Sequence, residues 1–401
     1  MNISFTKHEK SFIAGIGIIL AVRTLGFSLI TPVFSIYSTE IPGSTATLAG
    51  IAVGIFSITQ TILQVPFGRL SDAWGRKETT ILGFFIFLVG TLLGGLAENI
   101  YILIVSRFIA GAGAVSAVTM AWLTEGIDPG KRNSALSYVG IAIGTAVILG
   151  FTFSPLIAGR FGIPFIFYIS AMLIFFLILY ILCGLQNHRP QSPQPAKPEL
   201  SAFRELLCNR DLMRLNFIGF IGHFCITSIF FIMPILIKRE MDISEMWKIY
   251  VPVAVVGTSA MYYFSRKADS KGTVRIACIA LLLAVTGVMI PVFNAGIIWY
   301  LASFVLFYSG FCILSPVLPA AVSRHPDNYL KGSILGLFNS SQFIGSGAGG
   351  IFSGCMLGVG HQYLFGTLAA LLLLCWFCII GFKDFDNSGD GNFDVMRHIW
   401  P

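Results

Sequence analysis

Three side chains that can carry a positive charge lie within long apolar stretches of the sequence: Arg23, Arg107 and His223. Inside a membrane, an arginine costs about 2.5 kcal/mol on insertion scales, so such residues are usually kept for function or are firmly paired. A histidine titrates near neutral pH, which makes His223 a candidate proton carrier, although a lone histidine in a helix can also be a packing residue. The chemistry these residues could do is to bind an anion and to exchange a proton.

Arg23 and His223 occupy matching positions in two apolar stretches. Each lies about 12 residues past the polar residue that opens its stretch, Ser11 or Asp211, which is ~18 Å along a helix and near the middle of a ~30 Å hydrocarbon core. None of the nineteen Asp and Glu residues lies well inside an apolar stretch. A positive interior without an acid to neutralise it favours an anionic or zwitterionic ligand over a cation.

Amide side chains at similar depth extend the candidate binding site. Such groups can hydrogen-bond to a solute or to a neighbouring helix, and both interpretations remain open. Besides the two arginines and the histidine, the candidate substrate-binding residues are Gln60, Gln64, Asn216, Asn339 and Gln342.

The composition indicates what kind of element must position these residues. Of the 401 residues, 55% are hydrophobic and only 11% are charged, whereas soluble domains carry about 25% charge, so a soluble globule is excluded. Stretches such as 81–97 and 364–382 are continuously apolar, which is unlike the alternating strands of a membrane β-barrel. The sequence therefore predicts an all-α membrane protein.

Apolar runs bounded by charged or turn-forming residues give twelve predicted spans. They are 11–38, 46–68, 78–96, 99–125, 134–157, 163–185, 212–236, 248–265, 273–293, 296–323, 332–358 and 362–382. Residues 187–210 contain four prolines and predict a cytoplasmic linker between an N-terminal six-helix bundle, 1–186, and a C-terminal one, 211–382. Residues 383–401 are then a cytoplasmic tail.

An internal repeat supports two related, pseudo-symmetric halves. A D-x-x-G sequence follows both the second and the eighth predicted span, at 72–75 and 269–272, and the first span of each half carries a proline towards its outer end, Pro32 or Pro234. Two parallel repeats with a site between them are a transporter architecture.

The positive charges predict the orientation. Of the 26 Lys and Arg residues, 20 fall on the side shared by both termini, four fall on the other side, and two lie inside spans. By the positive-inside rule both termini are predicted to be cytoplasmic. The net charge of +7 is explained by this placement, so no nucleic-acid partner is expected.

The segment 68–77 reads G-R-L-S-D-A-W-G-R-K, and its two glycines allow a tight turn between spans. The Asp72 carboxylate can meet the positive end of a helix, and the eleventh span begins on the same side at Gly332. The three basic residues could serve only as topology anchors, which leaves Asp72 unexplained. We therefore predict a gating role for Gly68, Arg69, Asp72, Gly75, Arg76 and Lys77.

This segment resembles the loop 2–3 signature of the major facilitator superfamily, G-x-L-x-D-x-x-G-R-K, with every fixed position filled. The stretch from Arg107 to Gly113 looks like the family's R-x-x-x-G-x-G motif. In the fifth span, the segment around Gly150 and Pro155 resembles an antiporter motif, although Ser154 and Ala158 replace glycines and the upstream glycine spacing differs by one residue. We add Gly150 and Pro155 to the gating set. Together the twelve spans resemble the drug:proton antiporter type, which implies the major facilitator fold and that Asp72 holds the cytoplasmic side shut in the outward-open state.

The sequence differs from this transporter type in two places. Ser315 stands in the tenth span where the resemblance leads us to expect a glutamate, which weakens the case for conventional cation/proton exchange. About nineteen residues follow the last span, where a related transporter has a C-terminal soluble domain.

These observations predict a secondary active transporter of a small organic solute, working by alternating access, with proton-coupled export of an anionic or zwitterionic substrate. The alternatives are a passive facilitator or a proton symporter that takes up an organic anion. The expected partners are the lipid bilayer, the solute and protons, and the resemblance implies a monomer in a bacterial inner membrane.

Enzymatic activity is not expected. The sequence contains neither H-E-x-x-H nor G-x-S-x-G, and no P-loop that would bind ATP. The eight cysteines are scattered, and the pair Cys375 and Cys378 has no second pair or nearby histidine, so neither a metal site nor a cofactor is predicted.

Overall fold

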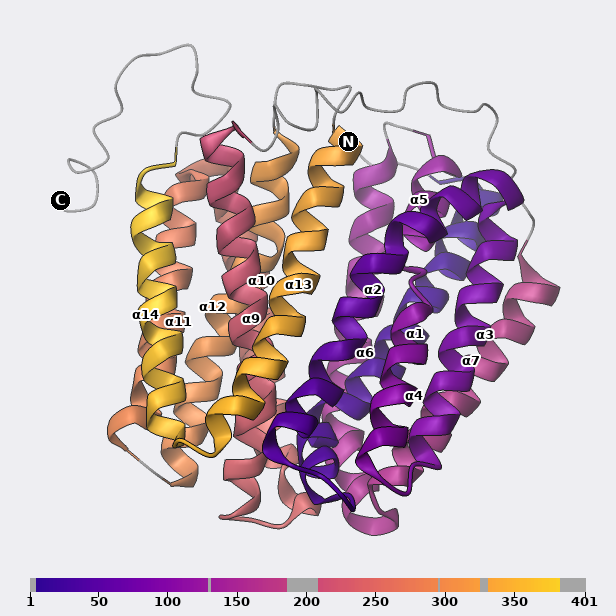
Figure 1. The fold of residues 1–401 in the computed structure, drawn as a ribbon. Coiled ribbons are helices and arrows are strands. Elements are labelled where there is room, and N and C mark those ends of the chain that lie inside the picture. Colours follow the sequence, from indigo (N-terminus) through magenta and orange to yellow (C-terminus); the bar gives the residue numbers. More distant parts are fainter. Residues whose placement is uncertain (1–4, 129–130, 186–207, 295, 325–330, 383–401) are drawn as a thin grey trace. The chain divides into compact units, whose positions relative to one another are not determined.

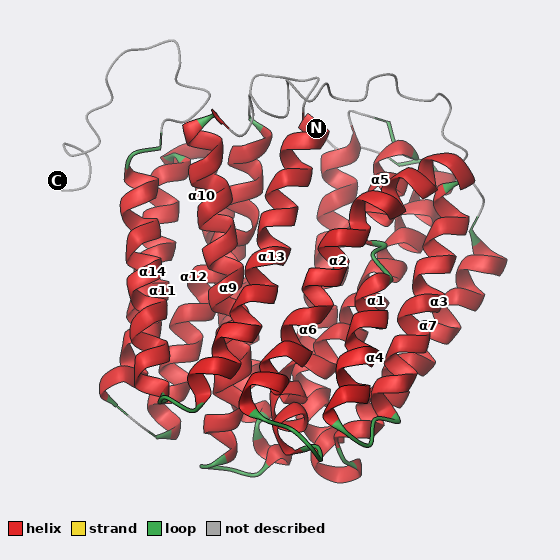
Figure 2. Ribbon diagram, viewed as in Figure 1, coloured by secondary structure: helices red, strands yellow, loops and turns green. Residues whose placement is uncertain are grey.

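The computed structural model describes residues 5–128, 131–185, 208–294, 296–324 and 331–382. Within these ranges every regular element is a helix and no strand occurs (Figure 2). The expectation of an all-α protein is confirmed. Most of the predicted linker, residues 186–207, and the predicted tail, residues 383–401, lie outside the described residues.

Figure 1 follows the helices along the chain. Those of the N-terminal half are α1 (Lys7–Glu40), α2 (Ala46–Trp74), α3 (Arg76–Gly95), α4 (Ile100–Ala112), α5 (Ser116–Glu125), α6 (Arg132–Phe161) and α7 (Ile163–Gly184). Those of the C-terminal half are α9 (Arg210–Lys238), the short 3-10 helix η2 (Ile243–Glu245), α10 (Trp247–Lys271), α11 (Thr273–Phe293), α12 (Ile297–Ser323), α13 (Lys331–Leu357) and α14 (His361–Ile380).

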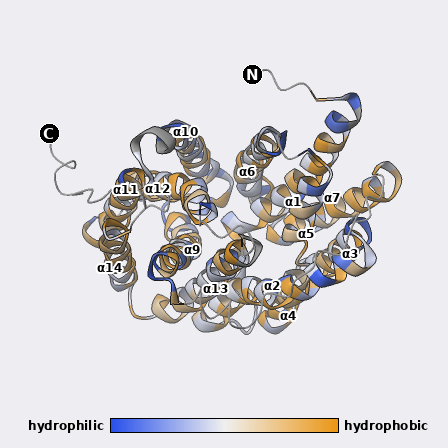
Figure 3. Ribbon diagram, turned by 90° about the horizontal axis from the view of Figure 1, so that it is seen from above, coloured by the Kyte–Doolittle hydropathy of each residue, from blue (hydrophilic) through white to orange (hydrophobic). Residues whose placement is uncertain are grey.

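Ten of these segments are long and apolar enough to cross a membrane, and α4 and α5 together make one of them. The other two predicted spans, 248–265 and 332–358, correspond to α10 and α13, which are helical but less apolar. Figure 3 shows the apolar colouring along most of the helical ribbon, with hydrophilic residues at several helix ends. This distribution is expected of helices whose middle portions avoid water.

By its packing the chain divides into two compact units, one of residues 1–194 with 234–251 and the other of residues 195–233 with 252–401. The sequence-based boundaries of the two bundles stay a prediction. Inside the first unit, one buried cluster surrounds Phe84 and Trp122 and contains Phe56, and a second surrounds Phe167 and contains Phe34. The first unit is therefore held by two apolar cores that meet along its helices.

Residues 234–251 belong to the C-terminal half of the sequence but pack in the first unit. They comprise the end of α9, η2 and the start of α10. The Tyr250 hydroxyl donates to the Pro32 carbonyl of α1 at 3.0 Å, and a Cβ added to Gly159 of α6 would lie 2.5 Å from Cβ of Ser244. A hydrogen bond and a close backbone approach thus seat this hairpin on α1 and α6.

The predicted span 99–125 corresponds to one apolar span, Ile100–Glu125, but this span contains two helices. α4 ends at Ala112 and α5 begins at Ser116, and Gly113 lies between them with φ −74° and ψ 55°. These angles and the hydrogen bond from the Ala114 amide to the Ala112 carbonyl, 2.9 Å, form an inverse γ-turn centred on Gly113. A Cβ at Gly113 would lie 2.4 Å from the carbonyl oxygen of Gly83, so the close approach of α3 requires glycine at the break.

Candidate functional site

Arg107 of α4 is the most constrained of the predicted site residues. Its side chain is buried, with the residue 5% exposed, and its guanidinium carbon lies 4.6 Å from the ring centre of Phe56 and 5.0 Å from that of Phe34. Nε and Nη1 have no hydrogen-bond partner, and no carboxylate pairs with Arg107 in the described part of the chain. Two aromatic rings stabilise the charge from the side, and two of its donor atoms find no partner among the described residues.

Arg23 of α1 is half-buried. Phe27 lies one turn further along α1, where residues four apart share a face, and its ring centre is 5.6 Å from that of Phe56. Among the described residues Arg23 has no hydrogen bond or ion pair. Arg107 therefore contacts Phe34 and Phe56, and Arg23 shares a face of α1 with Phe27, whose ring packs on Phe56.

The two predicted glutamines continue this face along α2. Phe56, Gln60 and Gln64 follow one another at four-residue intervals, so they share one side of the helix. Gln60 is buried and its Nε2 donates to the Ser116 hydroxyl at 3.1 Å, immediately after the break between α4 and α5. The Oε1 atoms of both glutamines are buried without a partner. In the first unit, Arg107 contacts Phe34 and Phe56, and Gln60 and Gln64 lie on the same side of α2 as Phe56.

The second unit brings together most of the remaining candidates on α9 and α13. His223 is half-buried, and because a carbonyl can only accept, its Nδ1 donates to the Gly219 carbonyl at 3.1 Å. Its ring lies edge-on to Phe311 of α12, at 5.3 Å between centres. Gln342 approaches the same turn of α9, since a Cβ on Gly219 would be 3.4 Å from its Cγ.

Asn216 lies one turn before this point on α9 and is buried. Its Nδ2 donates to the Leu212 carbonyl at 2.8 Å, its Oδ1 has no partner, and its backbone carbonyl accepts from the Ser341 hydroxyl at 3.2 Å. Asn339 is exposed on α13, and Ser315 is exposed on α12. No Asp or Glu makes an ion pair with His223 among the described residues. Its Nε2 is the ring atom available to take up a proton.

Arg76 is the centre of the predicted gating segment. Gly75, with φ 121°, ends α2 and precedes α3, as the proposed tight turn requires. Arg76 is 8% exposed and pairs with Asp72 Oδ1 at 2.7 Å. It also binds the Glu125 carboxylate at two points, from Nε to Oε2 at 3.0 Å and from Nη2 to Oε1 at 2.6 Å. It also donates to the Ser71 hydroxyl. The sequence identified Arg76 and Asp72 but not Glu125, which lies 49 residues further on.

The other residues of this segment have separate surroundings. Lys77 donates to the Leu182 and Leu185 carbonyls at 3.1 and 2.6 Å, which satisfies carbonyls at the end of α7. Arg69 is exposed, and nothing lies within 4 Å of a Cβ added to Gly68. The side chains of residues 269 and 331–333 lie outside what the structure describes, so the latch between Asp72 and the start of α13 stays a prediction.

The predicted gating residues of α6 lie in a continuous helix. Pro155 is inside α6, which runs unbroken through it, and the adjacent Ser154 is buried with its hydroxyl unpartnered. A Cβ added to Gly150 would lie 2.4 Å from Cβ of Ser28, so α1 and α6 cross in direct backbone contact here. Gly150 is therefore required by packing, and its gating role stays a prediction.

Comparison with known proteins identifies this architecture as that of a membrane transporter. The family model described as Major Facilitator Superfamily matches residues 16–350, and the chain belongs to that superfamily. The expectations of the family, of its twelve-helix fold and of a protein that is not an enzyme are confirmed.

Individual relatives cover nearly the whole chain. An uncharacterized transporter of Buchnera aphidicola is 29% identical over 92% of this chain and 96% of that one. The inner membrane transport protein YajR of Escherichia coli is 26% identical over 93% of this chain and 83% of that one. The crystal structure of the nucleoside transporter NupG superposes with a TM-score of 0.78, at 13% identity, over 92% of this chain and 99% of that one, which supports the fold alone.

Proposed function

We propose that the protein is a secondary active transporter that exports a small organic anion or zwitterion by alternating access, coupled to protons. The observation that carries the substrate class is the Arg107 guanidinium, buried between Phe34 and Phe56 with Nε and Nη1 unpartnered. An unpaired buried charge is costly, whereas a carboxylate that reached it would form charge-assisted hydrogen bonds. A bound anion therefore supplies what the protein leaves open.

A second cation on the same aromatic cluster supports an anionic over a cationic solute. Arg23 lies one turn before Phe27 on α1, and the Phe27 ring packs on Phe56, which contacts Arg107. Gln60 and Gln64 add neutral hydrogen-bonding groups on the adjoining face of α2, which suit the hydroxyl or amide groups of an organic molecule. A lipophilic cation would meet repulsion from both arginines.

His223 is the proposed proton carrier. Its Nδ1 is held by the Gly219 carbonyl, so protonation takes place at Nε2 and turns a neutral ring into a cation in an apolar helix. Such a change in charge can bias a transporter between two conformations. Export as the direction rests on the antiporter-like segment of α6. Under the passive alternative, a pH gradient would have no effect on transport.

The proposed orientation in the membrane follows from the charge distribution of the sequence. We propose that both termini face the cytoplasm, because the Lys and Arg residues concentrate on their side. A bacterial inner membrane and a monomeric state complete the proposal.

Transport by the purified protein in proteoliposomes tests the substrate class. A panel of radiolabelled anions, zwitterions and lipophilic cations is offered with and without a pH gradient. We expect anions or zwitterions to be moved, and Arg107→Gln to raise the apparent KM at least tenfold, since a charge-assisted pair contributes about 1.5 to 3 kcal/mol.

Arg160→Ala is the matched control, because Arg160 is an exposed arginine at the end of α6 that stacks only on its neighbour Phe161. It should leave transport unchanged. Preference for cations, unaffected by Arg23→Ala and Arg107→Gln, would overturn the proposed substrate class.

A further inference from the structure

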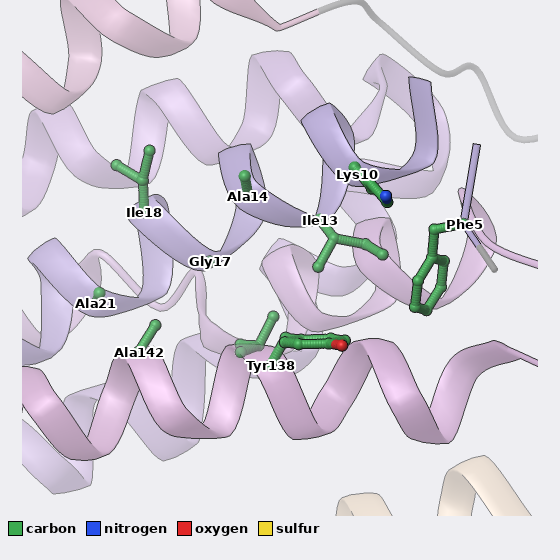
Figure 4. Close-up of a pocket in the computed structure, with 10 residues that line it drawn as sticks. Phe5, Lys10, Ile13, Ala14, Gly17, Ile18, Ala21, Tyr138 and Ala142 are labelled. Carbon is green, nitrogen blue, oxygen red and sulfur yellow. The ribbon is translucent and has the colours of Figure 1, made fainter. Parts of the chain in front are cut away.

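A pocket of about 400 Å³ lies between α1 and α6, apart from every residue proposed above to bind solute. Figure 4 shows Phe5 and Lys10 at one end of it and Ala21 with Ala142 at the other. Small residues of both helices leave the space open: a Cβ added to Gly17 would make only an ordinary contact, at 3.9 Å, with Val139. The lining between the two ends is apolar.

The length of the pocket matches one leaflet of a bilayer. From Lys10 to Ala21 is eleven residues of α1, or about 16 Å along the helix axis, and half of a ~30 Å hydrocarbon core is ~15 Å. Lys10 lies one residue inside the span Glu9–Glu40, and Tyr138 lies four residues inside the span Ser134–Phe161. By length and composition the pocket therefore begins near the start of both candidate spans and extends about half of a bilayer core along them.

The end of the pocket at the membrane surface carries an uncompensated positive charge. Lys10 is exposed and has no ion pair among the described residues. The neighbouring Glu9 is already neutralised by Lys131, at 2.9 and 3.0 Å to its two oxygens, and this carboxylate raises the pKa of the Lys131 ammonium. Tyr138, 60% exposed, directs its hydroxyl towards the same end (Figure 4). Lysine and tyrosine are side chains that favour the headgroup region.

We propose that this pocket binds an anionic phospholipid, with one acyl chain along the α1–α6 groove and the phosphate at Lys10. The groove accounts for the chain, because its walls are apolar and as long as a leaflet is thick. The single unpaired ammonium accounts for an anionic headgroup, because the phosphate of an anionic lipid has no ammonium of its own, whereas that of a zwitterionic lipid is already compensated within the headgroup. This site is independent of the proposed solute site and of its coupling to protons.

Native mass spectrometry of the full-length protein, released from detergent after incubation with phosphatidylglycerol, phosphatidylethanolamine or phosphatidylcholine, tests the proposal. We expect phosphatidylglycerol to be retained in preference to the other two. Lys10→Ala should weaken that retention about fivefold, the usual effect of one lysine at an anionic surface, and Lys10→Arg should restore it. Lys7→Ala removes an exposed lysine that does not line the pocket and should have no effect.

A second measurement locates the acyl chain. Phosphatidylglycerol with a photoreactive group in its acyl chain should cross-link to peptides that contain residues 13–21 or 138–142. Ala142→Leu places a larger side chain in the groove and should reduce both this cross-linking and the retention of the lipid. Gel filtration of each variant checks that it is folded.

Three results would overturn the proposal. They are equal loss of lipid in Lys7→Ala and Lys10→Ala, equal retention of zwitterionic lipids, and cross-links confined to other helices. A stable dimer mass that Ala142→Leu abolishes would assign the groove to a second copy of the chain instead.

Discussion

Arg76 and Glu125 form a two-point ion pair that ties the first turn of α3 to the last residue of α5, with contacts of 2.6 and 3.0 Å. The pair is partly shielded from solvent, because the Arg76 side chain is 10% exposed and that of Glu125 is 40% exposed. The basic residue of the superfamily signature is therefore anchored to the end of the broken fourth span, and not only to the adjacent Asp72.

The pair should contribute measurably to stability. We expect Arg76→Ala and Glu125→Ala each to lower the unfolding temperature in detergent, and the double variant to be little worse than either. The coupling from a double-mutant cycle should be about 1 to 2 kcal/mol, between that of exposed pairs and that of bidentate buried ones. Fully additive losses would mean that the two side chains do not act together.

Asp72 can be separated from this pair. Asp72→Asn removes one partner of Arg76 but leaves Glu125 in place, so stability should change little. A cysteine can be introduced at Gly68 without a clash, because no described residue lies within 4 Å of a Cβ at that position. If the Asp72 carboxylate is the predicted latch, the labelling rate of this cysteine should rise in Asp72→Asn. Asp128→Asn, at a carboxylate with 74% exposure, is the matched control. Equal labelling in the parent protein, Asp72→Asn and Asp128→Asn would contradict the predicted latch role of Asp72.

His223→Ala should uncouple transport from the pH gradient. Exchange of labelled solute at equal concentrations on both sides needs no proton and should persist, whereas accumulation driven by the gradient should disappear. His361→Ala is a suitable control, because His361 opens α14 at the end of a span and not in its middle. Unchanged accumulation in His223→Ala would exclude the histidine as the proton carrier.

The crossing of α1 and α6 offers a test of packing with a built-in comparison. Gly150→Ala places a methyl group 2.4 Å from Cβ of Ser28 and should destabilise the protein by about 1 to 3 kcal/mol. Gly140→Ala, on the same helix with nothing within 4 Å, should be neutral or stabilising by up to about 1 kcal/mol, since alanine is the better helix former. Thermal unfolding of both variants measures the difference.

The helices, the family and the motif residues could be predicted from the sequence because their signals are local. Long apolar runs predict α1 to α7 and most of α9 to α14, and the ten-residue signature stands out on its own. The segment 99–125 shows the limit of such signals, since its composition is that of a continuous span. At the break, a Cβ added to Gly113 would lie 2.4 Å from the carbonyl oxygen of Gly83 on α3, and no local pattern reveals this approach of another helix.

The candidate site could be predicted only as separate residues. The sequence places Arg107 at mid-depth, but the positions of Phe34 and Phe56 around it depend on the packing of α1 and α2 against α4. Phenylalanines are too common here, 36 in all, for two of them to be identified as partners from sequence. Glu125 was missed as the partner of Arg76 for the same reason: the pairing is fixed by tertiary structure.

The hairpin of residues 234–251 bears on how this chain can be divided. The Tyr250 hydroxyl donates to the Pro32 carbonyl, and Ser244 packs against Gly159. An isolated fragment that ends before the linker lacks both residues, so it would expose the Pro32 carbonyl of α1 and the backbone of α6 at Gly159. Co-expressed fragments split between the halves should accordingly reassemble, whereas the N-terminal fragment made by itself should be prone to aggregation.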